Sequence, residues 1–230
     1  TGIKKLLLFT KKYLQRYDIK TAQNPDFLIS NSIFVQQWVK THYKRDSVVI
    51  YPPVEIDNFE ISNNKEDYYI TIGRLEPYKR FDVIIEAFKK NGKKLIVVGD
   101  GSMRKDLENK SLSNITFVGY KNKIEVSSLL RKAQAFIYAG VEDFGIVYIE
   151  ALASGVPIIG YNGGALPEII EDGKEGYLYS QQSVDELNIS IEKFFKFGVL
   201  LTPHEIREKS KRFSKEVFQQ NFEKFISENS

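Results

Sequence analysis

The feature that most constrains the fold is a regular alternation of two kinds of segment between residues 68 and 200. Short apolar runs, rich in β-branched and aromatic residues, alternate with longer runs of helical character. The strand candidates are 68–72, 94–98, 114–118, 135–139, 156–160 and 176–179, and the helix candidates between them are 81–91, 102–110, 123–133, 145–154 and 166–172. Apolar strands joined by helices form parallel sheets that are covered on both faces. The sequence therefore predicts an α/β fold with a Rossmann-like, doubly wound parallel sheet.

The loops that follow these strands are where a ligand is expected. Open parallel sheets bind ligands in the crevice outside the carboxyl ends of their strands. The connections here are short and rich in Gly and Asp, as βα turns are. The segments of interest are GRLEPYK (73–79), GDGS (99–102), GYKNK (119–123), GVEDFG (140–145) and NGGALPE (162–168).

The segments outside this alternation are less regular. Two strand candidates (27–32 and 47–54) flank an amphipathic helix candidate (33–43), which is too few elements to close a sheet. Pro52 and Pro53 cannot continue a strand ladder, so a boundary near residue 55 is expected. The predicted division is 1–54, the end of a second domain; 55–67, a polar linker; 68–200, the ligand-binding domain; and 201–230, C-terminal helices that pack toward the second domain.

Composition and charge exclude several classes of function. The net charge of +3 is too small to indicate nucleic-acid binding, although it suits a small anionic ligand. The chain has no cysteine and only two histidines, His42 and His204, which argues against a disulfide framework or a zinc site. No apolar run approaches the roughly 20 residues of a membrane span. The first residues lack a signal-peptide cleavage site, so a cytoplasmic location is predicted.

Two glutamates flank the expected start of the helix at 145–154. Gly145 lies where that helix begins, and a helix start offers unpaired N–H groups with a partial positive charge. Such an end binds anions, and a glycine there lets a ligand approach the backbone. Glu142 precedes the helix and Glu150 lies within it, with seven residues between the two, and a carboxylate can accept two sugar hydroxyls. Taken alone, the pair could equally be a loop carboxylate and a residue on a solvent-exposed helix face.

Two cations lie in the loop that follows the first strand of the sheet. Gly73 ends this strand, and Arg74 and Lys79 lie in the following turn, where they could neutralise a diphosphate without a metal ion. No Asp-x-Asp pair suited to Mg²⁺ is present. The competing interpretation is two solvated charges in a chain that has 33 lysines and arginines. Gly99 and Gly101 could belong to a phosphate-binding turn, but an arginine replaces the third glycine of G-x-G-x-x-G, so a tight βα turn is the simpler interpretation.

The joint order of these motifs is more specific than any one of them. GRL-x3-K, GDG, Glu-x7-Glu around FG, SGVPIIG, GGALPEII and EGYLY follow one another along the chain. This order resembles the retaining glycosyltransferases of family 4, which have the GT-B fold, and the resemblance covers residues 48–227. Within that family the chain looks most like bacterial mannosyltransferases of polysaccharide assembly, through YPPV, GRL-x-PYKRFD and EDFGIV-x-x-EA.

The resemblance implies a role for each charged residue of these motifs. Arg74 and Lys79 would hold the donor diphosphate and stabilise the leaving nucleoside diphosphate. Glu142 would orient the donor sugar, and Glu150 would bind the ribose hydroxyls. Arg74, Lys79 and Glu142 are therefore the predicted catalytic residues. The other predicted substrate-binding residues, which supply backbone contacts or frame the base, are Gly73, Gly99, Gly101, Tyr120, Lys121, Phe144, Gly145 and Ile146.

The resemblance also implies a reaction. The expected activity is that of a retaining hexosyltransferase of the EC 2.4 class, which transfers mannose from GDP-mannose without a metal or other cofactor. The expected partners are the nucleotide sugar and a glycan or lipid-linked acceptor of bacterial polysaccharide biosynthesis, with no nucleic acid. This chain would be the donor-binding part, and the full-length enzyme would work in the cytoplasm or in peripheral contact with the inner face of the membrane.

Several alternatives differ from this expectation. The main one is a catalytically inert module that binds nucleotide sugars or acts as a scaffold, because the same motifs would support binding alone. The Glu-x7-Glu motif argues against a sugar-nucleotide epimerase with the GT-B fold. A nicotinamide-dependent dehydrogenase would need the complete G-x-G-x-x-G and an acidic residue about 20 positions further on.

Overall fold

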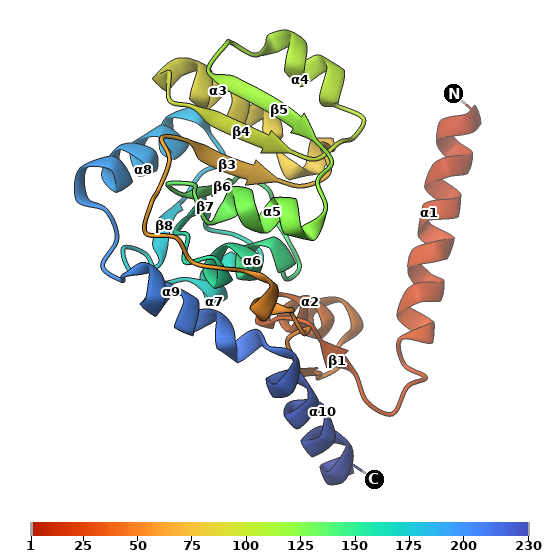
Figure 1. Cartoon of the computed structure of the whole chain (residues 1–230). Helices are drawn as coiled ribbons and strands as arrows, with labels where there is room; N and C mark the ends of the chain where they lie inside the picture. The colour runs from red at the N-terminus through yellow and green to blue at the C-terminus, as the bar shows by residue number, and fades with distance from the viewer. Residues whose placement is uncertain (1, 230) are drawn as a thin grey trace. The chain divides into compact units, whose positions relative to one another are not determined.

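The computed structural model describes residues 2–229, and the chain divides into two compact units after Tyr51 (Figure 1). The first unit contains helix α1 (Gly2–Thr21), strand β1 (Ile29–Ser30), helix α2 (Ile33–Tyr43) and strand β2 (Val48–Val49). β1 and β2 pair in parallel, since α2 returns the chain between them. Ser32 caps α2 by accepting a hydrogen bond from the Val35 N–H. Helix α2 has the predicted bounds, whereas the strands β1 and β2 are only two residues long, shorter than the predicted strands.

The second unit contains one six-stranded sheet, and all its strands are parallel. The strand order is β5-β4-β3-β6-β7-β8. The strands are β3 (Tyr69–Ile72), β4 (Leu95–Val98), β5 (Ile115–Gly119), β6 (Phe136–Tyr138), β7 (Ile158–Tyr161) and β8 (Gly176–Tyr179). The chain moves outward from β3 to β5 and then returns to β6 on the other side of β3. The predicted doubly wound α/β fold is confirmed, and its direction of winding reverses between β3 and β6, where such folds bind ligands.

Helices follow every strand of this sheet (Figure 1). Those that the sequence predicted are α3 (Phe81–Asn91), α4 (Arg104–Lys110), α5 (Lys123–Leu130), α6 (Ile146–Ala153) and α7 (Leu166–Ile169). After β8 come α8 (Val184–Phe197) and, in the segment predicted as C-terminal helices, α9 (Pro203–Ser210) and α10 (Lys215–Asn229). Single 3-10 turns precede β3 (η1, Ile56–Asn58), precede α3 (η2, Pro77–Lys79) and lie between α9 and α10 (η3, Lys211–Phe213). Helix α8 is not among the predicted helices, although Ser183 caps it and Leu187 and Ile191, four residues apart, are buried.

The core lies on both faces of the sheet. Ile70 and Phe136, on the two central strands, have no exposed surface, which agrees with strands that are apolar throughout. On one face a continuous apolar cluster joins the sheet to α3, α4 and α8. On the other face α6 packs against α9. A sheet covered in this way leaves only the ends of its strands open to a ligand.

The segment at 55–67 differs from the polar, weakly structured linker that the sequence predicted. Ile56 and Phe59 are buried, and the Arg207 guanidinium donates a hydrogen bond to the Phe59 carbonyl. The Val54 N–H donates to the Phe213 carbonyl at 2.9 Å. The boundary between the compact units accordingly lies at residue 52, three residues before the predicted linker, and residues 55–67 belong to the second unit.

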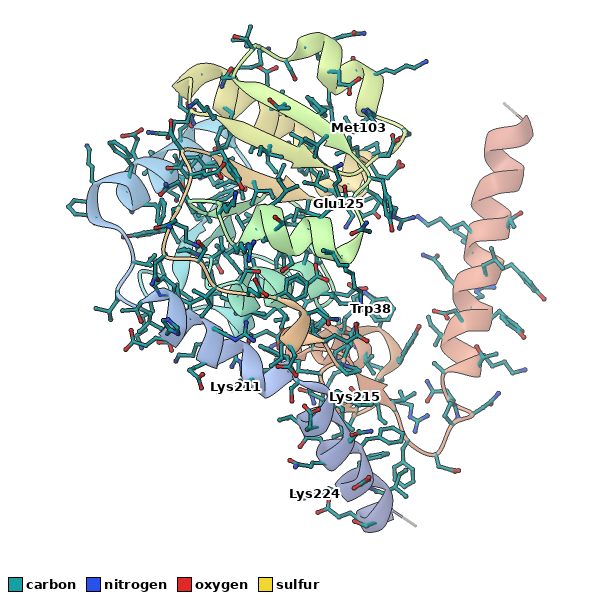
Figure 2. All side chains as sticks on the ribbon, in the orientation of Figure 1. Trp38, Met103, Glu125, Lys211, Lys215 and Lys224 are labelled. Carbon is teal, nitrogen blue, oxygen red and sulfur yellow. The ribbon has the colours of Figure 1, made fainter. Side chains whose placement is uncertain are left out.

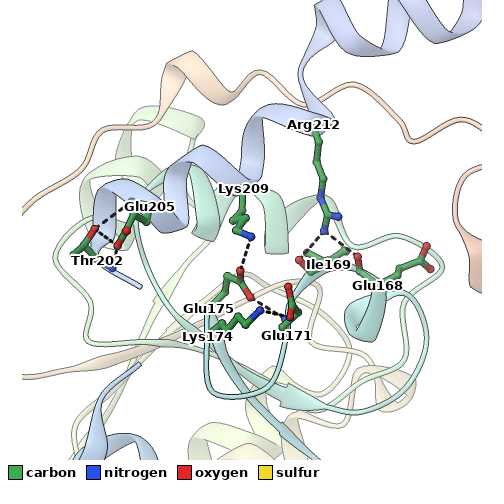
Figure 3. A network of polar contacts seen from close by, with 9 residues as sticks. All are labelled: Glu168, Ile169, Glu171, Lys174, Glu175, Thr202, Glu205, Lys209 and Arg212. Atoms are coloured by element: carbon green, nitrogen blue, oxygen red, sulfur yellow. Dashed lines mark hydrogen bonds and ion pairs between the residues drawn. The ribbon is translucent and has the colours of Figure 1, made fainter. Parts of the chain in front are cut away.

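The C-terminal residues 201–230, which the sequence predicted as a separate part of the chain, belong to the second unit. Figure 3 shows the contacts that hold this segment. Thr202 and Glu205 form a capping box at the start of α9. The Lys209 ammonium lies 3.5 Å from the buried carboxylate of Glu175, and the Arg212 guanidinium donates to the Ile169 carbonyl at 2.8 Å. These contacts tie α9 and η3 to the loop between α7 and β8.

We predict that Phe59→Ala lowers the free energy of unfolding by about 3 kcal/mol, because it leaves a cavity where a buried ring packed. Urea unfolding followed by circular dichroism measures this change. Asn63→Ala, at an exposed position of the same segment, serves as the control and should change the free energy by less than about 0.5 kcal/mol. Equal, small effects of both substitutions would restore the interpretation of 55–67 as a linker.

Candidate functional site

The candidate site lies at the carboxyl ends of β3 and β6, where the winding of the sheet reverses. The loop after β3 carries Lys79 and the loop after β6 carries Glu142. The two loops touch at Gly140, where an added Cβ atom would lie 3.0 Å from the Lys79 Cα atom. A side chain at position 140 would therefore push the loops apart. The fold brings Lys79 and Glu142 together although 63 positions separate them.

Lys79, Glu142 and Tyr138 form one hydrogen-bonded cluster in this crevice. The Lys79 ammonium pairs with Glu142 Oε1 and donates a hydrogen bond to the Tyr138 hydroxyl at 3.2 Å. The Tyr138 hydroxyl in turn donates to Glu142 Oε1. Burial, with the neighbouring Tyr148 and Glu142, raises the pKa of Tyr138 far above its usual value, so this phenol stays protonated as a donor. The Lys79 and Glu142 side chains keep 14% and 21% of their surface exposed, so a ligand in the crevice can reach them.

Arg74 lies in the same loop as Lys79 but is more exposed. Its guanidinium donates a hydrogen bond to the Tyr78 hydroxyl at 3.3 Å. The Tyr78 ring also lies next to the Lys79 ammonium, 5.4 Å from ring centroid to nitrogen. Tyr78 therefore contacts both cations. Because Arg74 has no carboxylate partner among the described side chains, its charge is available to an anion.

Helix α6 starts at this crevice without a side-chain cap. Gly145 precedes it with φ +83°, and an added Cβ atom would lie 2.3 Å from the Tyr148 ring, so only glycine fits. The Tyr148 hydroxyl is buried and has no hydrogen-bond partner within residues 2–229. Phe144 packs its ring against Phe213, with centroids 5.6 Å apart. The Gly145 and Ile146 backbone therefore forms an open helix start, whereas the Phe144 side chain belongs to the core.

Glu150 lies on the wall of a cavity of about 480 Å³ within the second unit. The cavity is lined by Pro53, Val54, Glu55, Phe59, Lys123, Ile146, Glu150, Lys215, Phe218 and Gln219. Burial raises the pKa of Glu150, and the positive charge of Lys123 partly opposes this shift. Lys123 itself pairs with Glu55 at 2.5 Å. The two predicted glutamates thus occupy different places, Glu142 in the Lys79 cluster and Glu150 in this cavity, with the start of α6 between them.

Other predicted residues are placed less simply. A Cβ atom added to Gly99 would lie 1.9 Å from the carbonyl oxygen of Gly73. A Cβ atom added to Gly101 would lie 2.6 Å from the carbonyl oxygen of Leu75. The packing of the β4–α4 loop against the β3–α3 loop therefore accounts for both glycines without a ligand. Tyr120 is 81% exposed, and the Lys121 ammonium pairs with Glu125 at 2.9 Å (Glu125 is labelled in Figure 2).

Sequence reasoning missed Tyr138, Lys123 and Glu55. Tyr138 is the last residue of β6, and the apolar pattern of this strand indicates a core residue. Only its hydrogen bonds with the Lys79 ammonium and Glu142 reveal a polar role. Lys123 stands in the GYKNK loop that the sequence selected, but it lines the Glu150 cavity where Lys121 and Tyr120 do not. Glu55 was assigned to the linker. The direction in which a loop side chain points could not be read from the sequence.

Two further observations limit what the site and chain contain. Among the described residues, no group of three His, Cys, Asp or Glu side chains is placed to hold a metal ion. Within the same part of the chain, no helix combines the length and apolar character needed to cross a membrane.

Comparison with known proteins identifies relatives of the chain. A family model described as glycosyl transferases group 1 matches residues 54–217. An uncharacterized glycosyltransferase of Methanocaldococcus jannaschii is 32% identical over 212 residues, which are 87% of this chain and 58% of that protein. The chain thus spans little more than half the length of this curated relative.

Solved structures share the fold at low sequence identity. Sucrose-phosphate synthase of Thermosynechococcus elongatus matches with a TM-score of 0.83 and 17% identity, covering 94% of this chain and 61% of that one. Anabaena HepE in complex with UDP-glucose matches with a TM-score of 0.81 and 21% identity, covering 93% and 67% of the two chains. At these identities the matches establish the fold alone.

Two carboxylates, the half-buried Glu150 and the buried Glu175, should respond oppositely to loss of charge. The raised pKa of Glu150 means that the folded chain holds this proton to a higher pH than the unfolded chain, so stability falls as pH rises through that interval. Glu150→Gln should therefore increase the free energy of unfolding at pH 7 and have little effect below about pH 4, where the carboxyl is protonated in both states. Urea unfolding at the two pH values measures this difference.

Glu175→Gln is the matched comparison at pH 7. The Glu175 carboxylate accepts the Glu171 N–H at 2.8 Å and faces Lys209, so its loss should lower the free energy of unfolding by about 1–3 kcal/mol. If Glu150→Gln were also destabilising at pH 7, Glu150 would have a structural role in the folded chain.

Proposed function

Because the chain belongs to the glycosyl transferases group 1 family, we propose that it binds a nucleotide sugar as the donor of a retaining glycosyl transfer. The observation that carries this proposal is the arrangement around the start of α6. A lysine–glutamate–tyrosine cluster lies on one side and a cavity with a half-buried glutamate on the other. A nucleotide sugar has the matching chemistry, with hydroxyls at both ends and a diphosphate between them.

The donor diphosphate would bind Lys79, Arg74 and the open N–H groups at the start of α6. Lys79 is held by Glu142 in the ligand-free chain, so the diphosphate would compete with this carboxylate for the ammonium. Glu142, released from Lys79 but still bonded to Tyr138, could then accept hydroxyls of the donor sugar. Cations and the helix start would stabilise the charge that develops on the departing nucleoside diphosphate.

The nucleoside would occupy the cavity that contains Glu150. Its carboxylate could accept both ribose hydroxyls, and this bond would compensate the burial that raises the pKa of Glu150 in the free chain. Lys123, which lines the same cavity, would contact the base in place of the predicted Lys121. A site that is unfavourable for stability when empty and favourable when filled is typical of binding residues.

Mannose from GDP-mannose remains the first candidate donor, and bacterial polysaccharide biosynthesis the candidate process, both by resemblance. The similarity to HepE, which binds UDP-glucose, makes a uridine donor the second candidate. The proposed acceptor is a glycan or a lipid-linked glycan. The transfer itself is proposed for a protein of the full length that the relatives have. We also propose that the full-length enzyme works in the cytoplasm or at the inner face of the membrane.

We predict that the chain binds one class among GDP, GDP-mannose, UDP-glucose and UDP-N-acetylglucosamine, as measured by isothermal titration calorimetry. Lys79→Ala and Glu150→Ala should each weaken this binding about 10- to 100-fold, because each removes a charge-assisted hydrogen bond. Lys89→Ala is the control, since Lys89 pairs with Glu86 at 2.8 Å on α3, away from the crevice. Binding that both site variants leave unchanged would place the nucleotide elsewhere, and no binding of any nucleotide would contradict the proposal.

We predict that this affinity is the same with EDTA and with added Mg²⁺, because Arg74 and Lys79 supply the positive charge that the diphosphate needs. The same titration in the two buffers measures the effect. A tenfold or greater loss with EDTA would show that a metal ion takes part in donor binding.

An inert nucleotide-sugar-binding module is the alternative function, and nucleotide affinity does not separate it from a transferase. Product formation does. Incubation with the bound donor and glycan acceptors, followed by NMR of the anomeric proton, would show both transfer and retained configuration.

A further inference from the structure

The Tyr148 hydroxyl is a buried polar group with no role in the proposed donor site. Tyr148 has no exposed surface, and its hydroxyl has no hydrogen-bond partner among residues 2–229. A buried hydroxyl without a partner has given up its hydrogen bonds to water, so it lowers stability. A phenylalanine would fill the same space without this loss. The hydroxyl is explained if an acceptor becomes available to it in another state of the protein.

This hydroxyl belongs to the first turn of α6, next to the cluster of Lys79, Glu142 and Tyr138. The Tyr148 ring packs edge-on against the Tyr138 ring, with the centroids 5.2 Å apart. Glycine at position 145 makes room for the ring, because an added Cβ atom would lie 2.3 Å from it. Burial above all, and then the negative charge of Glu142, raises the pKa of Tyr148 well above its usual value. The phenol therefore keeps its proton, and it lies within electrostatic reach of the Glu142 carboxylate.

Among the polar groups around this hydroxyl, one carboxylate oxygen is unused. The Tyr179 hydroxyl already donates to the Tyr138 carbonyl at 3.1 Å. The Lys79 ammonium and the Tyr138 hydroxyl both bond to Oε1 of Glu142. No hydrogen bond within residues 2–229 reaches Oε2 of that carboxylate. A donor without an acceptor and a carboxylate oxygen without a donor thus belong to neighbouring side chains.

Lys79 fixes the orientation of this carboxylate in the ligand-free chain. Its ammonium pairs with Oε1 of Glu142, and a hydrogen bond between charged groups is stronger than one between neutral groups. When a diphosphate binds the ammonium, Glu142 loses that bond, and Tyr138 alone still donates to it. A half-buried carboxylate that loses a donor is destabilised unless another donor replaces it. Tyr148 is a neighbour with a donor to spare.

We infer that Tyr148 is a positioning residue, whose hydroxyl turns to donate to Glu142 when the Lys79 ammonium leaves that carboxylate. The exchange keeps two donors on Glu142 in both states, because Tyr138 stays bonded while Tyr148 replaces Lys79. Glu142 then remains ionised and oriented, ready to accept hydroxyls of the donor sugar. The exchange requires only the loss of the ammonium; that a donor diphosphate causes this loss rests on the proposed function.

A double-mutant cycle in the ligand-free chain tests the exchange, because Lys79→Ala removes the ammonium without any ligand. Thermal unfolding followed by circular dichroism measures the midpoint temperature. In the wild-type background, Tyr148→Phe should leave the midpoint unchanged or raise it, since the hydroxyl that it removes has no partner. In the Lys79→Ala background, the same substitution should lower the midpoint by about 2–4 °C, because the hydroxyl is then bonded to Glu142.

Tyr179→Phe is the matched control, since it removes a buried hydroxyl that is already bonded in the ligand-free chain. It should lower the midpoint equally in both backgrounds. Equal effects of Tyr148→Phe in the two backgrounds would overturn the inference. Equal losses would show that the hydroxyl is bonded before Lys79 leaves, and no loss in either background would show that it never reaches Glu142.

Calorimetric titration with GDP and with UDP relates the exchange to donor binding. Tyr148→Phe should weaken the binding of the nucleotide that the wild-type chain binds about tenfold, because Glu142 has one donor fewer in the complex. In the Lys79→Ala background it should change the affinity by less than about twofold, since the hydroxyl is bonded to Glu142 before and after binding. Wild-type binding that Tyr148→Phe leaves unchanged would overturn the inference alone. A wild-type chain that binds neither nucleotide would contradict the proposed function, and the thermal cycle would still decide the exchange.

Discussion

The contact between the β3–α3 and β6–α6 loops at Gly140 is the constraint on which the site depends. It exists because the chain returns from β5 to the other side of β3, so the two loops become neighbours at one edge of the sheet. Only this contact brings the Lys79 ammonium to the Glu142 carboxylate. The same edge receives the start of α6, where Gly145 leaves the backbone accessible. The cation of one loop thus meets the carboxylate and the helix start of another, although 63 positions separate Lys79 from Glu142.

Charge is distributed unequally between the two halves of this site. In the cluster, Lys79 and Glu142 neutralise one another, and Tyr138 bonds to both, so little charge is left uncompensated when the crevice is empty. Glu150 is in the opposite situation, because burial raises its pKa and Lys123 offsets this only in part. A ligand with a diphosphate and a diol would replace the first arrangement and complete the second.

The second unit uses its two edges differently. The carboxyl edge gathers glycine-rich loops, polar side chains and the cavity of Glu150. The amino edge carries the end of α8, where Phe195 and Phe197 are exposed. The polarity of a parallel sheet makes this separation possible, because every helix returns from one edge to the other.

The sequence by itself determined the class of fold and the segments that form the site. The alternation of apolar strands and helices requires a covered parallel sheet, and the order of its loop motifs indicated Arg74, Lys79, Glu142 and Glu150. Tertiary structure alone decided that Tyr138 joins Lys79 and Glu142, that Lys123 and Glu55 reach the Glu150 cavity, and that Ile56 and Phe59 anchor the supposed linker. Local pattern reports how much of a segment is buried, because apolar periodicity reflects burial. It does not report which distant side chains meet, since that depends on the order in which the strands assemble.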